Sequence, residues 1–336
     1  MDYLFITTIS MTFLYAFING YHDGGNVIAT IIASRSIKVK TAFILGCSFE
    51  FAGAILLGTA VAMTVGTGII SSDSILAYGP ATGSVFIISA ILSSIIWNIV
   101  TAILGIPSSS SHALMGGLVG AGISAFGFVS VNWINFILKV AVVMVTSPII
   151  GLATGFIIMK IMINYLIFKN RSFESYIKKF QFISMSALAF AHGSSDSQKA
   201  MGLIALELLI YRRIPEFQVP IYVTISCGLM IALGMSVGGY RIMRTVGKKL
   251  FTIQPVHSLA SQISASAVIL FSTIVGFPVS TTQIITSSVM GVGSAENPKK
   301  VKWIIVNKVL LSWFITIPSS AMIAFAIFKI ISIFLR

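Results

Sequence analysis

The feature that most constrains this sequence is a series of long apolar runs in which charged residues are almost absent. The runs lie near residues 4–18, 42–63, 85–104, 113–129, 134–167, 182–191, 203–211, 219–237, 256–275, 283–293 and 303–335. Only 9% of the 336 residues are charged, whereas a soluble domain carries roughly 25%. Since a membrane-spanning helix needs about 20 apolar residues, we expect an all-α polytopic membrane protein with roughly 10–12 membrane segments.

The basic residues stand in short stretches between the apolar runs. The net charge of +13 therefore indicates positive loops on the cytoplasmic side, and we expect no nucleic-acid partner. The most polar stretch, at residues 168–181, is interpreted as a short cytoplasmic linker between a first repeat (1–167) and a second repeat (182–336). If each half crosses an odd number of times, both termini lie outside. We expect the protein in the cell membrane.

Two short motifs occur once in each half of the sequence. Residues 16–26 read AFINGYHDGGN, and residues 189–199 read AFAHGSSDSQK. Residues 105–112 read GIPSSSSH, and residues 276–283 read GFPVSTTQ. The first pair is offset by 173 residues and the second by 171. Two different motifs that recur in one order at nearly one spacing indicate an internal duplication. We therefore expect two inverted-topology repeats with broken or re-entrant helices.

The Gly-x-Pro motifs predict helix starts within the membrane. Proline suits the first turn of a helix and hydroxyl residues cap it, so half-helices are expected to begin at Pro107 and Pro278. Such starts present free backbone N–H groups and the positive end of the helix dipole. Two of them brought together form a site for a small anion with several oxygens; close helix packing through small hydroxyl residues is the alternative. The substrate-binding candidates are Ser109, Ser110, Ser111, Ser280, Thr281, Thr282, Asn26 and Lys199.

Asp23 and Asp196 are the candidate cation-binding residues. A carboxylate in an apolar context is costly and is functional by default, and it suits a sodium ion or a proton that travels with an anion. A structural ion pair is the alternative, since Lys199 follows Asp196 by three residues. Further candidates for the cation are His22, Ser195, Glu50 and Gln262, with Asn19 as a helper and Asn98 and Glu207 as weaker cases. Glu50 and Gln262 are expected to occupy roughly equivalent places in the two halves.

No pattern typical of an enzyme is present in the sequence. We find no nucleophile–base pair, no Gly-rich nucleotide loop and no Cys/His ligand spacing, and we expect no cofactor beyond the coupling ion. Cys47 and Cys227 lie in apolar runs and are interpreted as packing residues. His112 and His192 are either neutral buried residues or proton carriers. An anion channel would not need the buried aspartates, and a sensor would carry a signalling domain, so a transporter is favoured.

The motifs resemble those of the inorganic phosphate transporter (PiT) family. Residues 191–199 (AHGSSDSQK), followed by Met201 and Gly202, match the signature of that family's second half. Residues 105–112, 276–283 and 245–249 (TVGKK) are similar to its other characteristic segments. The resemblance implies a symporter that imports inorganic phosphate with sodium or protons by alternating access. It also implies an inverted-repeat fold and a homodimer surrounded by membrane lipids.

The chain departs from that family's pattern at three places. His22 and Ser195 replace the asparagine before each aspartate, and Gln283 replaces a histidine. The loss of two amide oxygens changes the expected cation ligands and leaves open another tetrahedral oxyanion, such as sulfate. Phosphate at neutral pH still carries a proton that a carboxylate can accept, whereas sulfate has none. Asp23 and Asp196 therefore favour phosphate.

Overall fold

The computed structural model describes residues 2–106, 108–167, 173–238, 243 and 245–334, and every regular element in this part is helical. The first half contains α1 (Asp2–Ala33), α2 (Val39–Leu56), α3 (Ala60–Met63), η1 (Thr64–Gly68), α4 (Ser72–Ala77), α5 (Pro80–Leu104), α6 (Ser110–Phe126), η2 (Phe128–Ser130), α7 (Trp133–Phe136), η3 (Ile137–Ala141), α8 (Val142–Ile161) and η4 (Met162–Ile167). The second half contains α9 (Phe173–Ile210), α10 (Ile221–Val237), η5 (Thr245–Lys249), α12 (Pro255–Val275), α13 (Thr281–Glu296), η6 (Pro298–Lys300) and α14 (Trp303–Phe334).

Six helical segments of the described residues are long and apolar enough to cross a membrane. They are α1, α2, α5, the continuous run from α7 into η4, α12 and α14. The apolar α10 has 17 residues, and α6 and α13 have 17 and 16. The 38-residue α9 is long enough, but it carries the polar motif at 189–199. Together these make five long elements in each half, which confirms a polytopic all-α membrane protein.

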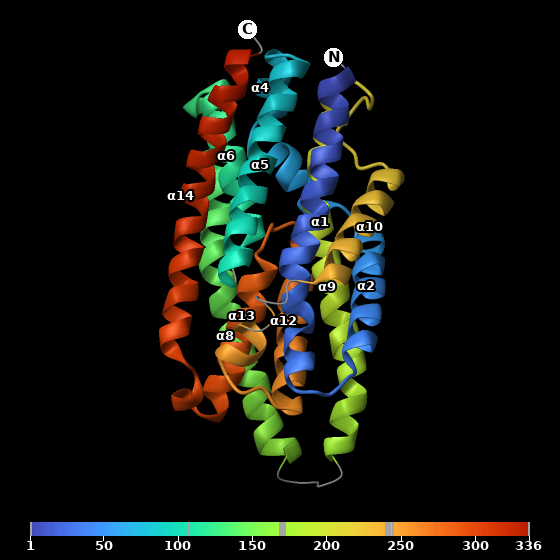
Figure 1. The fold of residues 1–336 in the computed structure, drawn as a ribbon, viewed down its shortest axis with the longest axis vertical. Coiled ribbons are helices and arrows are strands. Elements are labelled where there is room, and N and C mark those ends of the chain that lie inside the picture. The colour runs from blue at the N-terminus through green and yellow to red at the C-terminus, as the bar shows by residue number, and fades with distance from the viewer. Residues whose placement is uncertain (1, 107, 168–172, 239–242, 244, 335–336) are drawn as a thin grey trace.

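The two halves run in opposite directions (Figure 1). Both termini lie at one end of the molecule, and α8 reaches the other end, where α9 begins. In chain order, α1 corresponds to α9, α2 to α10, α5 to α12 and α6 to α13, and each pair runs in opposite senses. The expected inverted-topology repeat is therefore confirmed.

The repeats interlock through close helix crossings. α1 crosses α10 at Gly20, where a Cβ atom would lie 2.1 Å from the carbonyl oxygen of Ile231. α9 crosses α2 at Gly193, where a Cβ atom would lie 2.0 Å from the carbonyl oxygen of Glu50. Only glycine permits such an approach of two backbones. Likewise α6 packs on α14 and α13 on α8, so each half completes its packing with helices of the other.

These crossings correct one expectation about the repeat. Gly20 and Gly193 occupy the same place in the two duplicated motifs, so the residue that corresponds to Glu50 is Ile231. Gln262 lies on α12, which corresponds to α5 rather than α2. The expected equivalence of Glu50 and Gln262 is therefore wrong. The physical reason is that corresponding residues lie about 170–180 positions apart, as in Gly20 and Gly193 or Gly105 and Gly276, so the 212-residue spacing of Glu50 and Gln262 joins two different helices.

The Gly-x-Pro-x-Ser spacing breaks the helices in a specific way. Gly105 and Gly276 end α5 and α12 in the left-handed conformation, with φ of 65° and 81°, as glycine does readily. Ser109 and Ser280 then cap α6 and α13, because their hydroxyl oxygens accept hydrogen bonds from the backbone N–H groups three residues later, at 3.1 and 3.2 Å. Half-helices do begin at these motifs, as predicted.

The proline of this motif plays a different part from the one expected. Pro278 lies two residues before the N-cap of α13 rather than in its first turn, and its ring prevents α12 from continuing. Pro107 lies outside the described residues. Of the expected linker, residues 168–172 also lie outside them, and residues 173–181 form the first turns of α9. The division into 1–167 and 182–336 stays a prediction.

Candidate functional site

The duplicated polar motifs lie between two buried apolar clusters. One cluster includes Ala16 of α1 and Ala200 of α9. The other includes Val27 of α1 and Ala191 of α9. The starts of α6 and α13 meet this polar layer from opposite sides, since the two half-helices run in opposite senses. The site is therefore enclosed by four elements at intermediate depth in the molecule.

Asp23 on α1 receives hydrogen bonds from both half-helices. Thr282 Oγ1 at the start of α13 donates to Asp23 Oδ1 at 2.7 Å, and Ser110 Oγ at the start of α6 donates to Asp23 Oδ2. His22 Nδ1 lies 2.6 Å from Asp23 Oδ1. Asp23 is 1% exposed, so its partners replace the water that would otherwise solvate the carboxylate.

Asp196 on α9 is paired with a lysine, whereas the recorded ion-pair partner of Asp23 among the described residues is His22. Lys199 Nζ lies 2.5 Å from Asp196 Oδ1, and it also donates to Ser111 Oγ. Thr281 Oγ1 and Asn19 Nδ2 donate to Asp196 Oδ2 at 3.3 and 3.4 Å. All of these side chains are buried.

The contacts of the two halves follow the internal symmetry. Asn26 Nδ2 on α1 donates to Thr282 Oγ1 on α13 at 2.9 Å, and its counterpart Lys199 on α9 donates to Ser111 on α6. Each motif helix thus contacts the half-helix of the opposite repeat. The chemistry of the two contacts differs, because an amide stands in one and an ammonium group in the other.

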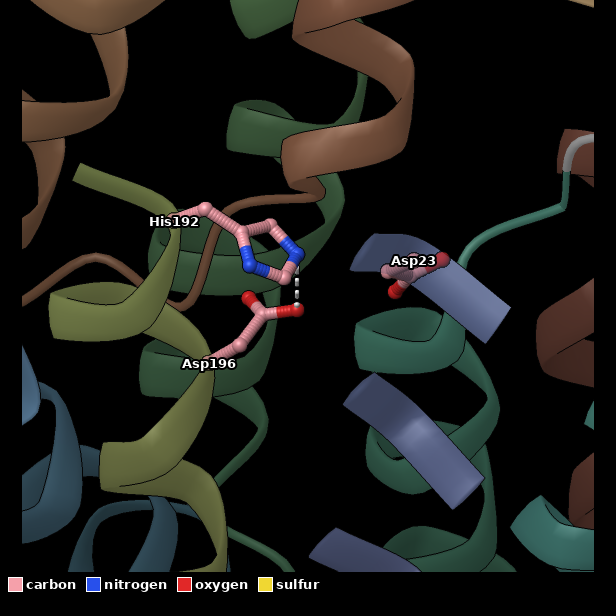
Figure 2. Close-up of side chains that lie close together, drawn as sticks. All are labelled: Asp23, His192 and Asp196. Carbon is pink, nitrogen blue, oxygen red and sulfur yellow. Dashed lines mark ion pairs between the residues drawn. The ribbon is translucent and has the colours of Figure 1, made fainter. Parts of the chain in front are cut away.

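A third carboxyl group reaches the site through a histidine. His192 Nδ1 lies 2.5 Å from Glu50 Oε1, and His192 Nε2 lies 3.3 Å from Asp196 Oδ2. Figure 2 shows His192 over Asp196, with Asp23 on the neighbouring helix. Asp23, His192 and Asp196 each offer one possible ligand atom, and these three atoms lie within 4.8 Å of one another. This arrangement can hold a cation between the two motif helices.

The charge balance of the site also favours a bound cation. Among the described residues of this cluster, three carboxyl groups (Asp23, Glu50 and Asp196) face the single permanently charged side chain of Lys199. His22 contacts Asp23, and His192 contacts Glu50 and Asp196, so two negative charges stay uncompensated when both histidines are neutral. A buried carboxylate is costly unless it is paired. Bound cations or protons would remove this imbalance.

Several buried oxygens in the site also have no hydrogen-bond partner among the described residues. They are Asn19 Oδ1, Asn26 Oδ1, Ser195 Oγ and Glu50 Oε2. Amide, hydroxyl and carboxylate oxygens are the ligands of hard cations, and a buried polar group without a partner calls for a ligand or water. The donor set therefore fits a sodium ion.

The remaining predicted residues lie apart from the contacts with Asp23 and Asp196. The hydroxyl oxygens of Ser109 and Ser280 cap their helices. Gln262 accepts from Ser184 at 2.6 Å and donates to Thr30 at 3.3 Å. Gln283, which replaces a histidine of the resembling family, lies 3.3 Å from His112 Nδ1. The three predicted members Ser109, Ser280 and Gln262, together with Gln283, are not joined to the two aspartates by a recorded hydrogen bond.

Sequence reasoning missed two features of the site. It gave His192 no place beside Glu50, although the imidazole joins Glu50 to Asp196. It also passed over Thr101, whose Oγ1 lies 3.1 Å from His22 Nε2 and accepts from Ser108 at 2.8 Å. Thr101 lies within an apolar run and is bounded by no motif, so the sequence held no signal for it.

A protein-family model described as the phosphate transporter family matches the chain twice, at residues 19–175 and 168–324. A probable low-affinity inorganic phosphate transporter of Bacillus subtilis is 38% identical over 328 residues, covering 96% of both chains. A protein of the same description from Rhizobium meliloti is also 38% identical, covering 96% of this chain and 94% of its own. Both likenesses extend over nearly the full length of each relative.

A solved structure described as the sodium-dependent phosphate transporter has a similar fold. It superposes with a TM-score of 0.84 and covers 99% of this chain and 100% of its own. The sequence identity is 22%, so this likeness concerns the fold. It agrees with the inverted repeat seen here.

Proposed function

Because this chain belongs to the phosphate transporter family, we propose that it is a symporter that moves inorganic phosphate inward together with sodium ions or protons. The observation that carries the proposal is the meeting of two half-helix starts with two buried aspartates. The half-helix starts suit an anion, and the aspartates suit the cation that accompanies it.

Phosphate would bind between the first turns of α6 and α13. The hydroxyl groups of Ser110, Ser111, Thr281 and Thr282 line these turns and are all buried. Lys199 and Asn26 reach the same turns from α9 and α1. The ammonium group of Lys199 would offset part of the anion's charge, and the amide of Asn26 would donate a hydrogen bond.

The coupling cation would bind beside Asp23, Asp196 and His192. The oxygens without partners on Asn19, Asn26 and Ser195 support sodium, because a proton would occupy only one of them. Binding of cation and anion together lowers the net charge that crosses the apolar core. The solved structure with this fold is described as sodium-dependent, which also supports sodium for this chain.

Alternating access would come from movement of the interlocked helices around this central site, as in other inverted-repeat transporters. The crossings at Gly20 and Gly193 join each motif helix to the second helix of the opposite repeat. α1, α2, α9 and α10 would therefore move as one group. The homodimer and the plasma-membrane location stay predictions.

The test is uptake of labelled phosphate into proteoliposomes, with a sodium gradient and a proton gradient imposed separately. We expect a sodium gradient to drive uptake, and we expect Asp23→Asn and Asp196→Asn each to lower it at least tenfold. Asp73→Asn is the matched control, because Asp73 is exposed on α4. Uptake of sulfate in place of phosphate would overturn the substrate, and unchanged uptake in both central variants would overturn the coupling site.

A further inference from the structure

A fourth buried carboxyl group among the described residues, that of Glu207, lies on α9 outside the central cluster. It follows Asp196 by 11 residues, which corresponds to about 16 Å along a helix, toward the end of the molecule that holds both termini. Glu207 is fully buried, and so are its neighbours Thr8 on α1 and Ser84 on α5. The uptake mechanism described above makes no use of it.

The recorded hydrogen bonds of Glu207 satisfy only one of its two carboxyl oxygens. Ser84 Oγ donates to Glu207 Oε1 at 2.7 Å, whereas Oε2 receives no hydrogen bond in the part of the chain that the structure describes. The hydroxyl group of Thr8 on α1 donates to the carbonyl oxygen of Leu4 at 2.8 Å. Glu207 Oε2 is therefore a buried oxygen without a partner among the described residues, which costs more for a charged carboxylate than for a neutral carboxyl group.

The surroundings of Glu207 supply no basic partner. Among the described residues, no lysine, arginine or histidine forms an ion pair with it. Its titratable neighbour on α9 is Tyr211, whose hydroxyl oxygen accepts from Ser84 at 3.3 Å. α1 and α5 present the neutral Thr8 and Ser84, and on α4 the carboxyl group of Asp73 is exposed. An ionised Glu207 would thus be a buried charge without compensation, which is strongly unfavourable.

We propose that Glu207 is a proton-binding site, separate from the central cluster, that holds α1, α5 and α9 together at the end with the termini while it is protonated. A hollow of about 600 Å³ lined by Pro80, Leu209 and Arg212 lies at the same end of the molecule, and Pro80 lies one turn before Ser84 on α5. On deprotonation the proton leaves Glu207 for solvent. The carboxylate left behind is a buried charge with no recorded basic partner among the described residues, so deprotonation loosens the packing of α1, α5 and α9 around it.

The direct test is infrared spectroscopy of the purified protein at neutral pH. We expect a band from a protonated carboxyl group in the wild type that Glu207→Gln removes. Ser84→Ala keeps the carboxyl group but removes the hydrogen bond to Oε1, so it shifts the band without abolishing it; this variant also serves if Glu207→Gln fails to fold. Glu216→Gln, at an exposed carboxylate of the next loop, leaves the band unchanged. Identical spectra of wild type and Glu207→Gln would overturn the proposal.

The pH dependence of thermal unfolding gives an independent readout. If the native state holds this proton while the unfolded chain ionises at neutral pH, stability is present at low pH and declines as the pH rises. We expect the wild type to show this decline more steeply than Glu207→Gln, which mimics the protonated form. Glu216→Gln should follow the wild type. Parallel profiles for wild type and Glu207→Gln contradict the proposal.

Discussion

Lys199 gives the central site its asymmetry at the scale of single residues. Its side chain is 0% exposed, although it carries a full charge. Its ammonium group has three donors, of which one reaches Asp196 and one reaches Ser111. The corresponding residue of the first half, Asn26, is neutral and contacts Thr282. The positive charge available to an anion therefore comes from the second repeat, while the first contributes a neutral donor.

This asymmetry predicts the effect of Lys199→Gln. The substitution leaves buried Asp196 without its lysine partner, with only the longer contact to His192 remaining among the recorded ion pairs. Breaking a buried pair costs about 3–5 kcal/mol, and the substitution also removes the charge that attracts phosphate. We expect a lower unfolding temperature and at least a tenfold loss of phosphate uptake. Asp196→Asn combined with Lys199→Gln should restore much of the stability but none of the transport. Lys299→Gln, at an exposed lysine, is the control; normal uptake by Lys199→Gln would contradict the assignment.

At the scale of helices, the α2–α9 crossing sets the position of Glu50 against His192. Gly193 packs on the backbone of Glu50, and Gly53 packs on that of Phe190, each with a would-be Cβ at 2.0 Å from a carbonyl oxygen. The two glycines bring the helices close enough for the 2.5 Å contact between His192 and Glu50. The close packing of α2 on α9 thus sets the position of the Glu50 carboxyl group at the site.

Gly193→Ala should therefore disturb both packing and transport. Backbone atoms cannot yield as a flexible side chain can, so overpacking here should cost about 1–3 kcal/mol or more. We expect a lower unfolding temperature and reduced uptake in the same variant. Gly68→Ala is the matched control, because the nearest atom to its Cβ would be a side-chain carbon at 3.5 Å. Equal stability of the two variants would show that the α2–α9 crossing tolerates separation.

Local signals in the sequence predicted the helix breaks, whereas the sequence did not predict the tertiary contacts. The Gly-x-Pro motifs predicted the starts of α6 and α13, and the duplicated aspartates predicted the site. By contrast, residues 182–191 and 203–211 form two separate apolar runs in the sequence, yet residues 182–191 and 203–210 belong to the single helix α9. The polar residues between them face the buried site rather than ending the helix. The contact of Glu50 with His192 joins residues 142 positions apart, and only the packing of α2 on α9 specifies it.

At the scale of the whole molecule, charge is distributed unevenly between the two ends. The end at which α8 and α9 meet also carries the α1–α2 and α13–α14 connections. These connections contain Arg35, Lys38, Lys299, Lys300 and Lys302. At the opposite end, Arg212 and Arg213 of the α9–α10 connection and Lys329 of α14 are offset in part by Glu216 and by Asp73 of α4. Because basic loops stay on the cytoplasmic side, the end where α8 and α9 meet should be cytoplasmic and both termini should be outside.

Labelling of single cysteines in intact cells tests this orientation. In a chain without Cys47 and Cys227, we expect Ser71→Cys, next to α4, to react with a membrane-impermeant maleimide added outside. Lys38→Cys, between α1 and α2, should react only after the membrane is opened. Both positions are exposed, so a difference in labelling reports the side of the membrane rather than burial. The reverse pattern would place the proton site at Glu207 on the cytoplasmic side and would require the positive loops to lie outside, against their usual preference.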